Sequence, residues 1–383
     1  MKKILFASTA LAAAGLMTGT ASASEKIKLE LGGFSSWWVV GAWQDSSYEK
    51  GATVDYNNVD VKGNNEIWFG GSTKLDNGMT VGVQIELEAG GNTETSQANG
   101  DVIDKSYIFV ETGFGKFIVG SESNGTVLLH VMAPDAAGNI DSDGVITSGA
   151  AISQAGGSTM VSTSIDTDGE AEGITYVAPT FYGLTVGGSY KPSVTEDNRG
   201  LSDLDSNVGE VFGVGALYAN TFGDVGVKVS AGWATYDANG GGATATSQGD
   251  STVNEYAFGT QISYAGFTVG GSYRDRDGFK QNPANLQDSM DAQVWDAGIQ
   301  YATGPYAVSF YYFHSEMVGS VTVAGEDTSD IYQVSGKYAL GPGVDLLATV
   351  GYAEYEDEVA KTGVNDPDYN EGWAVMTGMA LTF

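Results

Sequence analysis

The chain has 383 residues, with 17 Lys and Arg against 48 Asp and Glu, a formal charge of −31, 55 Gly and no Cys. This acidity leaves no basic surface to neutralise phosphates and argues against nucleic-acid binding. The absence of cysteine excludes disulfide scaffolds, thiolate metal sites and cysteine nucleophiles. The glycine content disfavours helices, because an interior glycine costs a helix about 1 kcal/mol relative to alanine. With 42% hydrophobic residues the chain is not disordered, so we expect an all-β protein.

The N-terminus has the three parts of a secretory signal peptide. Residues 1–3 are Met-Lys-Lys, residues 4–17 are apolar, and Ala21-Ser22-Ala23 offers a small-residue cleavage site. We expect residues 1–23 to be removed and 24–383 to form a single domain. The alternative, a membrane anchor, is disfavoured because the apolar stretch is shorter than the roughly 20 residues of a spanning helix. No later apolar run approaches that length, so a membrane-inserted mature protein would have to be a closed barrel.

Apolar residues alternate with small or polar residues throughout the mature chain, which is the period of a β-strand. The clearest case is 80–88, where four aliphatic residues share one face and Gln84, Glu86 and Glu88 lie on the other. Similar alternation occurs at 184–191, 225–234, 267–274 and 372–383. The sequence therefore predicts many short strands, each with one apolar face and one more polar face rich in glycine and alanine.

Two kinds of connection alternate along the chain. Tight turns rich in glycine, asparagine and proline occur at 76–78, 113–116, 182–183, 222–224, 265–266, 303–305 and 341–343. Longer polar segments lie near 44–64, 89–102, 121–172, 191–209, 236–253, 276–291, 317–329 and 356–371. Seven turns and eight long loops separate sixteen strands. An even count, with both termini at the short-turn end, is typical of a closed antiparallel membrane barrel.

A large soluble β-sandwich, propeller or lectin-like array would also alternate with period two, but three observations favour the barrel. The polar face carries ionisable groups that a dry core would exclude and a wet lumen would solvate. The chain stops at Phe383, in phase with the apolar face of the last strand. Aromatic residues lie near strand ends, as in the interfacial girdles of outer-membrane barrels. The expected girdle residues are Trp37, Trp38, Trp43, Trp68, Tyr107, Tyr176, Tyr190, Trp233, Tyr256, Tyr273, Trp295, Tyr301, Tyr306, Tyr352 and Trp373.

These features resemble the sixteen-stranded general porins of Gram-negative outer membranes, particularly those of alphaproteobacteria. The resemblance covers the whole chain and includes Asn65-Glu66-Ile67-Trp68-Phe69-Gly70-Gly71-Ser72, the turn at 76–78, Ser106-Tyr107-Ile108-Phe109-Val110-Glu111 before Gly113-Phe114-Gly115-Lys116, and the terminal strand ending at Phe383. It implies an all-β, sixteen-stranded antiparallel transmembrane β-barrel in the cell outer membrane. It also implies that Phe383 belongs to the assembly signal read by the barrel-assembly machinery.

The third long segment, 121–172, is much longer than the others. The resemblance implies that it folds inward and narrows the channel into a constriction, where acidic loop residues face basic wall residues. A family motif of that loop, Pro-Glu-Phe-Gly-Gly, is matched here only in part by Ala133-Pro134-Asp135-Ala136-Ala137-Gly138. The loop-side candidates are Asp135, Asp141 and Asp143, with Asp166, Asp168, Glu170 and Glu172 later in the loop. By strand phase, the wall-side candidates are Lys28, Lys105, Lys191, Lys228, Arg274, Arg276 and Lys337. For each of them a solvated charge at the barrel rim is the alternative interpretation.

The acidic loops also suggest calcium. Asp141 with Asp143, and Asp166 with Asp168, are separated by one residue, and each pair precedes a glycine. Hard cations take several oxygen ligands, so a structural Ca²⁺ site at these four residues is a hypothesis, although none fits the twelve-residue helix-loop-helix pattern. No cofactor is otherwise required.

Catalysis is disfavoured, because His130 and His314 accompany no nucleophile elbow and no zinc-protease motif. The resemblance implies a porin for passive diffusion of small hydrophilic solutes and ions, and the acidity of the chain adds an expected cation preference. The resemblance implies a homotrimer in contact with outer-membrane lipid and lipopolysaccharide. The alternatives are a substrate-selective channel of the same fold and a secreted soluble carbohydrate-binding β-protein.

Overall fold

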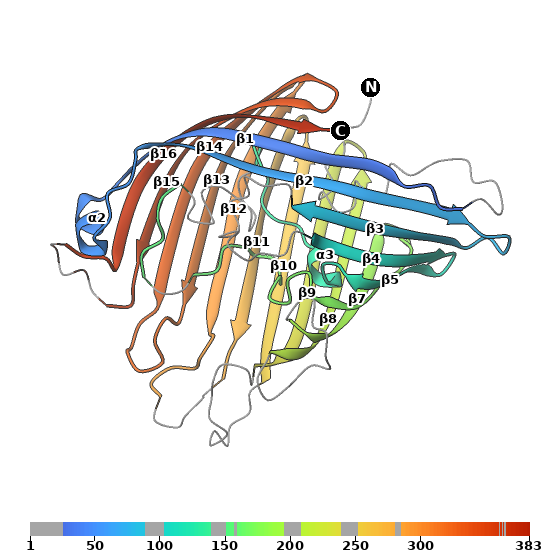
Figure 1. Ribbon diagram of the computed structural model, residues 1–383, viewed down its shortest axis with the longest axis horizontal. Coiled ribbons are helices and arrows are strands. Elements are labelled where there is room, and N and C mark those ends of the chain that lie inside the picture. The colour runs from blue at the N-terminus through green and yellow to red at the C-terminus, as the bar shows by residue number, and fades with distance from the viewer. Residues whose placement is uncertain are drawn as a thin grey trace.

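The computed structural model describes residues 26–88, 103–138, 151–156, 159–194, 208–238, 252–279, 285–359, 361, 363 and 365–383. In it, each strand is antiparallel to its neighbours and β16 returns to pair with β1, so the sheet is a closed barrel of sixteen strands. Figure 1 shows the strands running obliquely around the wall, with β16 beside β1. The predicted strand count and fold class are confirmed.

The strands have the following bounds: β1 Glu30–Gln44, β2 Val59–Lys74, β3 Thr80–Glu88, β4 Ile103–Thr112, β5 Gly115–Ser121, β6 Glu172–Val177, β7 Leu184–Ser193, β8 Gly209–Phe222, β9 Val225–Asp237, β10 Thr252–Tyr264, β11 Phe267–Asp277, β12 Ala292–Thr303, β13 Tyr306–Met317, β14 Asp327–Gly341, β15 Val344–Glu356 and β16 Tyr369–Thr382. The described parts of the long loops contain two short helices, α2 Ser46–Ala52 and α3 Gly125–Leu128. Among the described residues, no helix is long and apolar enough to cross a membrane.

The first loop is shorter than the sequence predicted. Residues 59–64 belong to β2 and pair with β1, for example Val61 with Val39, whereas the sequence predicts a loop there. The prediction is wrong because Asp60 and Lys62 make the segment polar in composition, while in the strand their side chains form an ion pair at 2.8 Å. The remaining loop contains α2, whose N-terminus is capped by the Asp45 carboxylate accepting from the Ser47 N–H at 2.8 Å.

The outer surface of the barrel is apolar. Ile108, Val119 and Ile174 are 59%, 49% and 53% exposed, and they alternate with inward residues along their strands. A soluble monomer rarely exposes so continuous an apolar surface. Lipid contact accounts for it, because the backbone groups of a closed barrel are all satisfied within the sheet.

Aromatic rings form two belts along parts of this outer surface. Near the long loops the rings of Trp295, Tyr312, Tyr332, Tyr352 and Trp373 contact one another in sequence, with centroids 4.6–6.4 Å apart. Near the short turns the contacting pairs are Phe117 with Tyr176, Phe267 with Tyr301, and Tyr306 with Tyr338. Amphipathic rings at two levels match the two interfaces of a bilayer.

Three residues assigned to the girdle by the sequence instead face the barrel interior. Trp38 is 4% exposed and packs in an interior apolar cluster. Trp68 donates its indole N–H to Glu66 at 2.8 Å, and Tyr107 lies opposite the buried Gln84. Proximity to a strand end therefore does not assign a face, because face alternates at every residue.

Candidate functional site: the third loop and the inner wall

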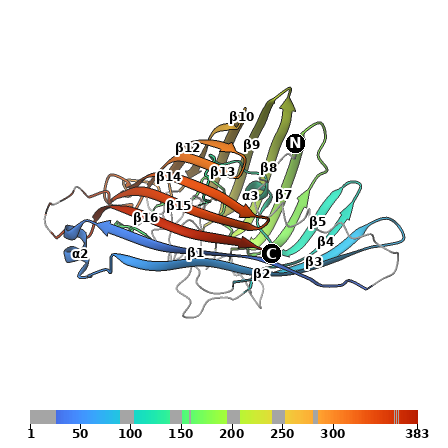
Figure 2. The ribbon, with the colours of Figure 1, turned by 90° about the horizontal axis from the view of Figure 1, so that it is seen from above.

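The third loop, residues 122–171, joins β5 to β6, and its described residues lie against the inside of the barrel. Figure 2 shows α3 within the ring of strands. Asn124 begins the loop's fold, because its side-chain oxygen accepts from the N–H groups of Thr126 and Val127 at 2.7 and 3.1 Å. Its amide group donates to the Ile165 carbonyl at 2.8 Å. One side chain thus caps α3 and ties the start of the loop to its end.

Glycines on the inner wall give the loop room to approach. A Cβ atom on Gly259 would lie 1.8 Å from the carbonyl oxygen of Val131, and one on Gly215 would lie 2.3 Å from that of Gly125. Neither distance is possible for a real side chain. On β8 and β10, the glycine-rich face predicted from the sequence therefore leaves space for the loop backbone to lie directly on the wall. We call Gly215 and Gly259 the glycine track.

The outgoing arm of the loop, residues 125–138, is fixed by wall side chains that bond to its backbone. Each contact comes from a different strand: Ser230 Oγ accepts from Val131 N at 3.0 Å, Gln261 Nε2 donates to Met132 O at 2.7 Å, Asp296 accepts from Ala133 N at 3.2 Å, and Ser309 Oγ accepts from Ala136 N at 2.9 Å. These side chains satisfy backbone groups that a buried loop would otherwise leave unpaired.

Asp135, a predicted loop-side residue, lies at the wall of β13 and β14. Its carboxylate accepts from the Ser309 hydroxyl at 2.8 Å and from the Gln333 amide at 3.3 Å. The other two loop-side candidates, Asp141 and Asp143, lie outside the described residues. Asp135 thus joins the tip of the outgoing arm to strands almost 200 residues further along the chain.

The returning arm, residues 159–171, is held by Arg274 of β11. The guanidinium forms ion pairs with Glu255 of β10 and Asp166 of the loop, both at 2.6 Å. It also donates to the carbonyl oxygens of Ser162 and Ser164 and to the Thr167 hydroxyl. Arg274 is 2% exposed and Glu255 is fully buried, so this predicted wall-side base meets the loop directly.

Lys191 of β7 makes a second direct contact between wall and loop. Its ammonium lies 3.2 Å from the Asp168 carboxylate and donates to the Gly169 carbonyl at 2.8 Å. Both charged side chains are 1% exposed, and Asn124 donates to the other oxygen of Asp168 at 2.6 Å. Burial raises the pKa of Asp168, against the lowering effects of Lys191 and Asn124.

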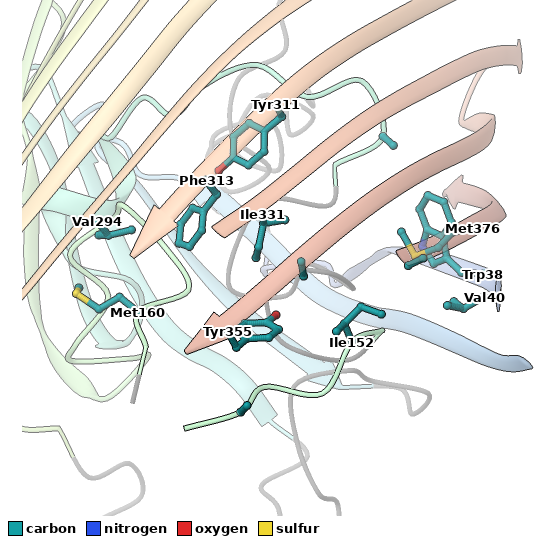
Figure 3. Packing of buried hydrophobic residues seen from close by; sticks show 14 of the residues in the cluster. Trp38, Val40, Ile152, Met160, Val294, Tyr311, Phe313, Ile331, Tyr355 and Met376 are labelled. Carbon is teal, nitrogen blue, oxygen red and sulfur yellow. The ribbon is translucent and has the colours of Figure 1, made fainter. Parts of the chain in front are cut away.

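An apolar cluster inside the barrel completes the docking of the loop. Figure 3 shows Ile152 and Met160 of the loop among buried side chains of β1 and β12–β16, which include Trp38, Val294, Phe313, Ile331, Tyr355 and Met376. Burial of one such side chain is worth about 1.5–3 kcal/mol. The inner wall is therefore apolar here, whereas the sequence alternation predicts a more polar inner face.

The two arms also meet each other. His130 of the outgoing arm lies 3.2 Å from the Thr163 hydroxyl of the returning arm. Burial, and then the nearby Arg274, lowers the pKa of His130 to about 3. The imidazole is neutral at physiological pH and acts as a hydrogen-bonding residue.

The remaining wall-side candidates occupy different places. Lys105 lies in the lumen and pairs with Glu86 at 3.1 Å and Asp104 at 3.3 Å. Arg276 donates to the Met290 carbonyl of the sixth loop at 2.6 Å. Lys337 lies 3.6 Å from Asp345 on the neighbouring strand. Lys228 is half-buried on the inner face of β9, and Lys28 is exposed before β1 at the short-turn end.

The inner wall of β2–β4 carries a group of carboxylates that the site prediction omitted. Glu66, Glu86, Glu88 and Asp104 belong to these strands, and Glu122 and Glu170 approach from the two ends of the third loop; the six are called the carboxylate wall below. Burial raises the pKa of Glu122 and raises that of Glu170 to about 7, against the lowering effect of Lys105 on both. The alternation at 80–88 placed Glu86 and Glu88 on one face, which is the signal that could have identified this group.

Among the described residues, two sets of carboxylates lie close enough to share a cation, and neither contains Asp166 or Asp168. Oxygen atoms of Glu66, Glu88 and Asp104 lie within 4.8 Å of one another, as do those of Asp327, Asp357 and Glu358. Asp166 and Asp168, by contrast, pair with Arg274 and Lys191. Asp141 and Asp143 lie outside the described residues.

A closed sixteen-stranded barrel with an apolar outside, two aromatic belts and an inward third loop defines a porin-type membrane channel. The chain matches the Gram-negative porin family over residues 7–358 and belongs to that family. It is a non-enzymatic β-barrel channel of the outer membrane. No curated protein sequence matches it.

Solved structures share the fold at low sequence identity. The anion-selective porin from Comamonas acidovorans is 15% identical, with a TM-score of 0.62, over 94% of this chain and 100% of that one. The outer membrane channel DcaP of Acinetobacter baumannii is 13% identical, with a TM-score of 0.61, over 95% and 99%. A mutant of Rh. blastica porin is 16% identical, with a TM-score of 0.57, over 93% and 100%.

Proposed function

We propose that this porin is a water-filled channel for passive diffusion of small hydrophilic solutes and ions, and that it prefers cations. The observation that carries the cation preference is the carboxylate wall on β2–β4, where six carboxylates gather around one lysine, Lys105. Carboxylates that line a pore raise the local concentration of cations.

The distribution of the basic residues supports the same preference. Lys191 and Arg274 are buried beneath the third loop against Asp168, Asp166 and Glu255, so an anion passing through the lumen does not reach them. Lys105 is compensated by Glu86 and Asp104. The described carboxylate wall lies on one side of the lumen, on β2–β4, and in this proposal its ionised members set up a transverse field in the constriction.

The test is the reversal potential of single channels in a planar bilayer under a KCl gradient. We expect a cation-selective reversal potential for the natural protein and a shift toward zero for the triple variant Glu66→Gln, Glu86→Gln, Glu88→Gln. Glu354→Gln is the matched control, because Glu354 faces outward and binds Tyr369 at 2.9 Å. A reversal potential near zero in the natural protein would contradict the cation preference, while silent bilayers would contradict the open channel.

A substrate-selective channel of the same fold is the second candidate. It would show conductance that saturates with one solute, whereas a general-diffusion channel shows conductance proportional to salt. The constriction in this proposal is formed by residues 121–172, and Asp135, Asp141 and Asp143 remain its proposed loop-side acids.

The proposed assembly is a homotrimer embedded in outer-membrane lipid and lipopolysaccharide. The aliphatic outer side chains of β2 and β4, such as Val61 and Ile108, which are 57% and 59% exposed, support a subunit interface on that side. Cross-linking of the unheated protein in detergent tests this, and a monomer would contradict it. We also propose that the chain is most closely related to alphaproteobacterial porins. A further part of the proposal is that the barrel-assembly machinery recognises Phe383.

A further inference from the structure

We infer that Arg274 is a positioning residue that holds the returning arm of the third loop against the wall and thereby sets the cross-section of the pore. This inference rests on the proposed channel function. It assigns to Arg274 a role different from that of a pore-lining charge, which is the role that its strand phase predicted.

The contacts of the guanidinium support a clamp. Arg274 reaches five acceptors, of which four belong to four different residues of the returning arm: the carbonyls of Ser162 and Ser164, the Asp166 carboxylate and the Thr167 hydroxyl. The fifth, Glu255, belongs to the adjacent strand. A planar guanidinium with donors in fixed directions suits such a set of acceptors, and a lysine ammonium does not.

The wall side of the clamp is rigid. Glu255 is fully buried and accepts from the Tyr236 hydroxyl at 2.8 Å as well as from Arg274. It also accepts from Thr167 of the loop at 2.5 Å. The arginine and its carboxylate therefore present a fixed surface, formed by β9, β10 and β11, to which the loop binds.

The burial of Arg274 excludes a direct action on permeating ions. The side chain is 3% exposed, and its charge is balanced by Glu255 and Asp166, both 2.6 Å away. A field-setting residue would face water with its charge uncompensated. Arg274 therefore affects permeation indirectly, by fixing the position of the third loop.

The chain offers a matched control on the same strand and face. Arg276 is also buried, at 8% exposure, but its guanidinium contacts the Met290 carbonyl and the Met317 sulfur rather than the third loop. Replacing either arginine by glutamine removes one positive charge from the inner wall of β11. Only the first replacement removes the clamp.

The experiment compares single-channel conductance and open-channel current noise of the natural protein with those of Arg274→Gln, Arg274→Lys and Arg276→Gln. We expect severalfold greater noise and a higher mean conductance in Arg274→Gln, the same direction in Arg274→Lys, and values near the natural protein in Arg276→Gln. Folded barrels are selected by their heat-modifiable electrophoretic mobility. The double variant Arg274→Gln, Glu255→Gln leaves no unpaired buried charge and is expected to show the same noise if the single variant fails to fold.

A disulfide provides the rescue. Thr163 of the loop and Ser272 of the wall are in contact, with hydroxyl oxygens 2.6 Å apart, and the chain has no cysteine of its own. Adding Thr163→Cys and Ser272→Cys to Arg274→Gln should restore the natural conductance when oxidised and lose it on reduction.

Two results would overturn the inference. The first is that Arg274→Gln has the noise and conductance of the natural protein. The second is that Arg274→Gln changes the reversal potential without changing the noise, which would show that the charge of Arg274 acts directly on permeating ions. Either leaves the channel function intact, whereas a silent natural protein contradicts the channel function itself.

Discussion

Phe383, the last residue, exchanges two backbone hydrogen bonds with Gly33 of β1: the Gly33 N–H donates to the Phe383 carbonyl at 3.0 Å, and the Phe383 N–H donates to the Gly33 carbonyl at 3.1 Å. This pair continues the seam between the first and last strands past Thr382. The side chain of Phe383 remains 61% exposed, so the residue closes the barrel with its backbone and presents its ring outward.

The backbone pairing of Phe383 can be separated from its proposed role in assembly. Phe383→Ala keeps both backbone hydrogen bonds, so refolding of the purified protein into detergent should be close to natural, while assembly in cells should fall. Deletion of Phe383 removes the hydrogen bonds as well, and both should fall. The fraction of heat-modifiable protein measures each case; equal assembly of natural protein and Phe383→Ala in cells would remove the assembly role.

Lys191→Met should destabilise the docked loop. It leaves the buried Asp168 carboxylate without its cation, a change that costs about 3–5 kcal/mol in buried pairs. Hydrogen exchange of the amides of 162–171 measures the loss, and adding Asp168→Asn should recover part of it. The control is Lys62→Met, whose exposed pair with Asp60 is worth about 0–1 kcal/mol. Equal exchange in the two lysine variants would contradict the prediction.

Glu170 should make selectivity depend on pH. Burial raises its pKa to about 7, against Lys105, with Asp104 adding to the increase. Because the pKa of Glu170 is higher in the folded than in the unfolded protein, folding favours the protonated carboxyl. The stabilisation that this protonated carboxyl gives to the folded state is lost as the pH rises toward 7. The charge appears over the same range, so cation selectivity should increase between about pH 6 and pH 8. Glu170→Gln should reduce this step in reversal potential; a step of unchanged size in the variant would assign the titration to another group.

Gly259→Ala should displace the outgoing arm. The added methyl would meet the Val131 carbonyl at 1.8 Å, and overpacking of this kind costs about 1–3 kcal/mol. We expect faster proteolysis within the third loop and a noisier open channel. Gly341→Ala is the control, since a methyl group at that position would meet nothing within 4 Å. Similar proteolysis of both variants would show that the glycine track is not needed.

Chelation should leave the described arms of the third loop in place. The Asp166 and Asp168 carboxylates are compensated by Arg274 and Lys191, so their docking does not require Ca²⁺. Hydrogen exchange of 162–171 with and without excess chelator is the measurement. Faster exchange after chelation would revive a structural calcium role for these residues.

Strand number, barrel closure and the outer face could be predicted from sequence because each depends on local signals: a period of two, turn residues and aromatic positions. The docking of the third loop depends on pairs far apart in sequence, such as Asp135 with Gln333, which no local pattern identifies. The same limit explains Trp38, whose face was misassigned, and Ile152 and Met160, which read as ordinary loop residues. Strand phase predicts that Arg274 and Lys191 lie on the inner wall. It does not predict that both side chains are buried beneath the third loop.

The separation between the third loop and its binding partners also orders the folding of the channel. Residues 125–138 are synthesised before Ser230, Gln261, Asp296 and Ser309, to which their backbone is bonded, and contacts of such long range form slowly because closure of the intervening chain comes first. The narrow part of the pore therefore cannot take shape before β9, β10, β12 and β13 supply these side chains, so the constriction depends on the wall being built first.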